Sequence, residues 1–67
     1  MTTILFEVCR RGQRSQWVVT RSNALYGAYL DQEQALLDAV DAARDAAQAG
    51  AEAEVWLKDR LSAARVF

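Results

Sequence analysis

The stretch that decides the fold is residues 31–50, which read DQEQALLDAVDAARDAAQAG. It predicts a helix from about Gln32 to Ala49. Asp31 is a favourable N-cap residue, and Gln34 follows it at the spacing of a capping box. Gly50 fits the position just past the helix, where the backbone often turns into the left-handed region. Both ends of the helix are therefore marked by local signals.

The same stretch also predicts which face of the helix is buried. Apolar residues recur at i, i+4, i+7 and i+11, a spacing that places them on one side of a helix. On the opposite side we expect Asp38, Asp41 and Asp45 to meet water, with Arg44 able to pair with Asp41 at i, i+3. The predicted buried stripe consists of Leu36, Val40, Ala43 and Ala47.

Strand-like segments lie on both sides of the helix. Residues 3–9 and 16–21 alternate between two faces, and the polar segment 10–15 between them contains a glycine, which predicts a hairpin. Residues 54–58 predict a strand after the helix, and a last short strand is expected within 61–67. Residues 25–30 fit either a short third strand or an extended approach to the helix, because Gly27 weakens a regular strand.

These elements predict one α+β domain spanning residues 1–67. The expected architecture is a small antiparallel sheet with one helix packed on one face, in the order β-β-α-β with possible short extra strands. A single helix covers only one face of a sheet. The uncovered face therefore carries either Trp17 with Val19 or their neighbours, and we expect a partner to pack there.

Composition excludes several classes of protein. The chain has no His and only one Cys, so neither a zinc site nor a disulfide framework can be built. No nucleophile–base pair or glycine-rich phosphate loop is visible, so we expect no enzyme activity, no metal and no cofactor. Cys9 reads as a small strand residue. No signal peptide or apolar span is present, which predicts no membrane association and the cytoplasm of a bacterium-like cell.

A thin core favours self-association. Hydrophobic residues make up 52% of the chain, but thirteen residues are alanine, which buries little area. Domains of this size are marginally stable, and many gain stability by forming oligomers. We therefore predict a small interaction module that forms a homodimer or a larger homo-oligomer through a sheet face or edge. The candidate interface residues are Trp17, Val19, Trp56 and Phe67.

The charge distribution leaves an alternative open. The net charge is +3 over residues 1–30, −6 over 31–54 and +2 over 55–67. A basic hairpin and sheet face could follow a phosphate backbone, with Trp17 stacking on a base. A sequence pI near 5.2 instead favours an ordinary solvated loop. The candidate nucleic-acid contacts are Arg10, Arg11, Arg14 and Arg21.

Several segments together suggest a family. An aromatic-x-Val strand at Trp17-Val18-Val19, a polar cap leading into an alanine-rich helix at 31–36 and 42–44, and Gly50-Ala51-Glu52 follow one another. The apolar strand and turn at residues 55–60 complete the pattern. The chain resembles the small bacterial domain-of-unknown-function family 2188 over most of its length. The resemblance implies a β-β-α-β fold and no known activity, so no functional residue is transferred from it.

Overall fold

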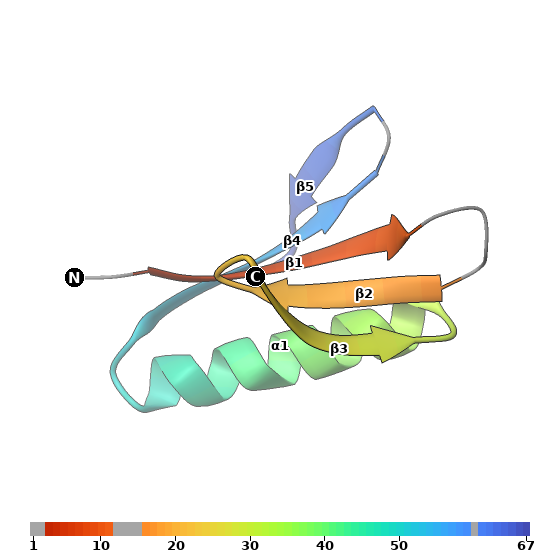
Figure 1. Cartoon of the computed structure of the whole chain (residues 1–67). Helices are drawn as coiled ribbons and strands as arrows, with labels where there is room; N and C mark the ends of the chain where they lie inside the picture. Colours follow the sequence, from red (N-terminus) through yellow and green to blue (C-terminus); the bar gives the residue numbers. More distant parts are fainter. Residues whose placement is uncertain (1–2, 12–15, 60) are drawn as a thin grey trace.

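Five strands and one helix form the domain in a computed structural model, which describes residues 3–11, 16–59 and 61–67 (Figure 1). Three strands precede the helix and two follow it. The predicted loop residue Arg14 and the turn residue Arg60 lie outside the described residues. The elements are β1 (Thr3–Arg11), β2 (Gln16–Arg21), β3 (Ala24–Tyr29), α1 (Gln32–Gln48), β4 (Glu52–Lys58) and β5 (Ala63–Arg65).

The strands form one mixed sheet in the order β3-β2-β1-β4-β5, with α1 lying along one face (Figure 1). This confirms the α+β class and the single helix on one face. The expectation of a wholly antiparallel sheet is corrected at one place, because β1 and β4 pair in parallel. The reason is the helix, which returns the chain along the sheet so that β4 starts at the same end as β1. All other strand pairs are antiparallel.

The ambiguous segment before the helix is a true strand, β3. Ser22 and Asn23 have φ values of 48° and 72°, which two-residue hairpin turns of type I′ require, and they join β2 to β3. A register shift at Val19/Thr20 marks a bulge in this pair. Gly27 has a steric role, since a Cβ there would lie 2.7 Å from the hydroxyl oxygen of Tyr29. The glycine thus makes room for the Tyr29 side chain.

Both predicted ends of α1 are confirmed. Asp31 is the N-cap, and its Oδ1 accepts a hydrogen bond of 2.7 Å from the backbone N–H of Gln34. At the other end Gly50 has a φ of 96°, and the Ala51 N–H donates to the Ala46 carbonyl at 3.0 Å. This is the Schellman arrangement, which satisfies carbonyl groups that the helix leaves unpaired.

The buried face of α1 is rotated around the helix axis relative to the predicted one. Leu36 and Val40 are only half-buried and Ala47 is exposed, whereas Asp38 is half-buried rather than on the wet side. Alanine methyl groups let the helix lie close to the sheet, and the larger Leu36 and Val40 pack along the border of that contact. The helix residues with no exposed surface are Ala35, Ala39 and Ala43.

The core lies between this alanine stripe and the covered face of the sheet. Phe6 and Val8 come from β1, Val19 from β2 and Val55 from β4, and each is 0–1% exposed. No polar or charged side chain is buried among the described residues. Within the same residues, no helix is long and apolar enough to span a bilayer.

Tyr29 joins the last strand before the helix to the helix itself. Its side chain packs against the core, and its hydroxyl donates a hydrogen bond to the carboxylate of Asp38. Asp38 also accepts a bond of 3.3 Å from the side-chain amide of Gln34. Burial, followed by the hydrogen bond and negative charge of Asp38, raises the pKa of Tyr29 from 10.0 to about 12. The folded state therefore favours the protonated phenol.

We expect Tyr29 to ionise well above pH 10 in an alkaline titration of the folded protein followed by tyrosinate absorbance. The stabilising effect of protonated Tyr29 is complete below pH 10 and is lost as pH rises towards 12, because the unfolded chain ionises at the lower value. Tyr29→Phe should abolish this high-pH transition, and Asp38→Ala should move it to lower pH. Ionisation of Tyr29 near pH 10 in the folded protein would contradict this assignment.

Candidate functional site

The candidate site is the sheet face that α1 does not cover, here called the open face. Residues paired across neighbouring strands point to the same side of a sheet, so the strand register defines this face. Two rows of side chains cross all five strands on it. One row is Leu25, Thr20, Glu7, Trp56 and Arg65. The other row is Ala28, Val18, Cys9, Lys58 and Ala63.

Over β1, β2 and β3 the open face carries a group of apolar side chains next to polar ones such as Thr20 and Gln16. Leu25 is 65% exposed on the edge strand β3, and Leu5 is half-buried on β1. Val18 lies between Ala28 and Cys9, is only 6% exposed and does not belong to the core cluster beneath the helix. We call these five residues, Leu5, Cys9, Val18, Leu25 and Ala28, the apolar half of the open face.

Over β4 and β5, together with Glu7 of β1, the open face is charged and carries two ion pairs. Lys58 Nζ pairs with Glu7 Oε2, and the nearest nitrogen of Arg65 lies 3.9 Å from Glu54 Oε2. Trp56 Nε1 donates a 2.9 Å hydrogen bond to Glu54 Oε1, which fixes the indole ring on the sheet. The bond to Glu7 raises the pKa of Lys58. The charged half, Glu7, Glu54, Trp56, Lys58 and Arg65, thus holds two acids and two bases, and Glu52 at the start of β4 is a further exposed acid on the same side.

The predicted interface residues do not come together on one surface. Trp17 and Val19 lie on the face that α1 covers, and Val19 has no exposed surface with which to contact a partner. Trp56 lies on the open face, so the two tryptophans are on opposite sides of the sheet. Phe67 packs against the core beneath the helix.

Of the two alternatives predicted for the uncovered face, the structure shows the second: Trp17 and Val19 face α1, and their neighbour Val18 lies on the open face. Leu5 and Leu25 were not among the predicted interface residues. Leu5 alternates with Ile4 and Phe6, which was the signal for its side of β1. Leu25 was not assigned to a face because β3 was ambiguous, and the bulge shifts the faces along that strand.

The described arginines of the nucleic-acid hypothesis are also separated. Arg10 and Arg11 are exposed at the end of β1, where they pair with Trp17 and Gln16. Arg21 lies at the opposite end of the same hairpin, paired with Phe6, and its guanidinium carbon is 5.9 Å from the centre of the Phe6 ring. No common basic surface forms among the described members of the set.

The open face offers few groups for chemistry. Cys9 is a free, half-exposed thiol. In residues 3–11, 16–59 and 61–67, no three potential metal ligands of the His, Cys, Asp or Glu type gather at one place. The arrangement of the face instead suits contact with another surface.

Comparison with known proteins adds no relative: no family model, curated protein or solved structure matches the chain. The resemblance to family 2188 therefore stays a prediction.

Proposed function

We propose that the chain is a small, non-enzymatic interaction module that self-associates through its open face. The observation behind this proposal is the apolar half, where Leu25 is 65% exposed and Leu5 is half-buried on a sheet face that no described element covers. Apolar surface gathered in one place favours association, because burying it removes it from water. The single cysteine fits a reducing compartment and supports the cytoplasm as the location.

A second copy of the chain suits this face better than a strongly charged partner. The charged half is already neutralised within one molecule by Glu7 with Lys58 and by Glu54 with Arg65. These two pairs reduce the like-charge repulsion between two such faces. A two-fold interface uses the same patch on both copies, which internally paired charges allow.

The size of the domain is also compatible with a dimer. Standard interfaces bury about 800 Å² on each partner. The accessible surface of the described structure is 4849 Å², so such an interface would take up about a sixth of it. Burying the open face would add a second apolar contact to a domain whose own core depends on three alanines and a few larger side chains.

We expect light scattering after size exclusion to show a dimer or higher oligomer at high micromolar concentration, at both low and moderate salt. Leu25→Glu should produce a monomer, because a carboxylate would have to be buried against the partner's apolar half. Salt should have little effect, since the charges of the open face are paired within each copy.

The matched control is Leu37→Glu. Leu37 is 55% exposed on α1 and Leu25 is 65% exposed on β3, so the chemical change is the same on opposite sides of the molecule. Only the Leu25 variant should dissociate. A monomeric wild type under these conditions, or an oligomer that persists in Leu25→Glu, would overturn the proposal.

Nucleic-acid binding through Arg10, Arg11, Arg14 and Arg21 is the less favoured alternative. Arg21 is separated from the other described arginines, so these residues form no common basic surface, and Trp17 packs against the core. The nucleic-acid hypothesis predicts salt-dependent binding that weakens when the arginines are changed to alanine. Titration of the monomeric Leu25→Glu variant with DNA and RNA at low salt would separate this function from self-association.

A further inference from the structure

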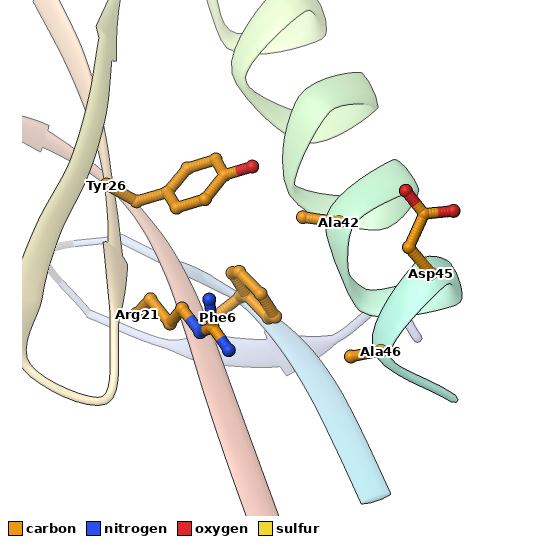
Figure 2. A pocket seen from close by; sticks show the side chains of 6 residues that line it. All are labelled: Phe6, Arg21, Tyr26, Ala42, Asp45 and Ala46. Carbon is orange, nitrogen blue, oxygen red and sulfur yellow. The ribbon is translucent and has the colours of Figure 1, made fainter. Parts of the chain in front are cut away.

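A hollow of about 310 Å³ lies on the other side of the sheet, where α1 passes the hairpin of β2 and β3 (Figure 2). Ligand sites begin at about this volume and combine apolar walls with a few polar groups. The hollow has this character, and it lies away from the open face. Its lining residues are Phe6, Arg21, Tyr26, Ala42, Asp45 and Ala46.

The sheet side of the hollow is aromatic and positively charged. The rings of Phe6 and Tyr26 meet edge to face, with centroids 5.7 Å apart and planes at 88°. Figure 2 shows the Tyr26 ring extending from its strand towards the helix, with Arg21 beside Phe6. The guanidinium lies 5.9 Å from the Phe6 centroid and forms no ion pair with a described residue. Its N–H groups therefore remain available to a carboxylate.

The helix side is small, apolar and negatively charged. Ala42 and Ala46 present only methyl groups, which leaves the space open, and Asp45 stands beside them (Figure 2). Asp45 forms no salt bridge with a described residue, unlike the neighbouring Asp41. The last turn of α1 has no basic residue, so the partial negative charge of the helix end adds to that of Asp45. This side favours a cation.

We propose that this hollow binds a small zwitterion, an α-amino acid with an apolar or aromatic side chain. The carboxylate of the ligand would meet Arg21, its ammonium group would face Asp45, and its side chain would lie against Tyr26 and Ala42. An anion without an ammonium group is repelled by Asp45, and a cation without a carboxylate is repelled by Arg21. A ligand with both charges satisfies both walls.

The test uses the full chain and L-phenylalanine as the probe, with amide resonances followed by NMR. Phenylpropionate, which lacks the ammonium group, and phenethylamine, which lacks the carboxylate, are compared with it. We expect phenylalanine to shift the resonances of Arg21, Tyr26, Ala42 and Ala46. Each analogue should bind about tenfold more weakly or worse, because each loses one charge-assisted contact.

Substitutions of Asp45 and Arg21 test the roles of the helix side and the sheet side of the hollow. Asp45→Asn should remove the preference for phenylalanine over phenylpropionate, and Arg21→Gln should remove the preference over phenethylamine. Asp41→Asn, one turn earlier on α1 and outside the hollow, should leave both preferences unchanged. The proposal is overturned if phenylalanine causes no shifts, if all three compounds bind equally to the wild type, or if the shifts map to the open face.

Discussion

Replacing Phe6 with alanine is expected to lower the free energy of unfolding by about 3–5 kcal/mol. Phe6 is 1% exposed on the central strand β1, beside Val55 of β4 and beneath the helix. It is the largest of the fully buried side chains in the described structure. Removing it deletes the largest side chain of the core, and the alanines of α1 are too small to fill the space.

The consequence is severe because the domain is small. Proteins have about 0.05–0.15 kcal/mol of stability per residue, which gives roughly 3–10 kcal/mol for 67 residues. Phe6→Ala should therefore lose about a third or more of this stability. Urea titrations followed by tryptophan fluorescence measure the effect, with Leu37→Ala on the exposed side of α1 as control. A Phe6→Ala protein within 1 kcal/mol of the wild type, at equal denaturant slope, would show that the core is not organised around this ring.

Replacing Ala39 with leucine is expected to destabilise the domain by about 1–3 kcal/mol, or more if the backbone cannot move. Ala39 is the middle residue of the buried alanine stripe and has no exposed surface. Its methyl group sets how closely the helix approaches the sheet. A leucine there must either push α1 away from Val8 and Val55 or adopt a strained rotamer.

Ala47→Leu provides the matched control for this change. Ala47 belongs to the same helix but is exposed, and leucine and alanine have similar helix propensities. Thermal unfolding of the two variants therefore compares the same substitution on the two sides of α1. Ala39→Leu should unfold at lower temperature, and Ala47→Leu close to the wild type. The opposite order would indicate that the stripe predicted from the sequence, which included Ala47, is the correct one.

The parts of the fold that depend on neighbouring residues were predicted well. Asp31 and Gly50 marked the ends of α1 because a cap and a left-handed residue are satisfied within one turn of chain. The rotation of α1 was missed because the pattern gave weight to Leu36 and Val40 as the most hydrophobic residues. Packing instead selected the smallest ones, since only alanine permits the close helix–sheet contact that buries Phe6.

The features of the fold that depend on contacts between residues far apart in the sequence were harder to predict. Nothing near β4 indicates that it joins β1 in parallel, because that pairing is decided by the path of the whole chain. The sequence predicted that one sheet face is uncovered, but the residues on that face could be identified only from the strand register across β1, β2 and β3. Trp17 and Trp56 have similar sequence surroundings, yet one packs under the helix and the other lies on the open face.

The parallel pairing of β1 and β4 also shapes how the domain can fold. Thr3 and Glu52, which face each other at its start, are 49 positions apart in the chain. Closing so large a loop costs chain entropy before any contact repays it, whereas the hairpins β2–β3 and β4–β5 need only short loops. The hairpins can form early, but none of them completes the sheet. The slow step in folding is therefore the pairing of β1 with β4. Because β1 lies at the centre of the sheet, the loss of β1 during unfolding should unfold the whole domain as one cooperative unit.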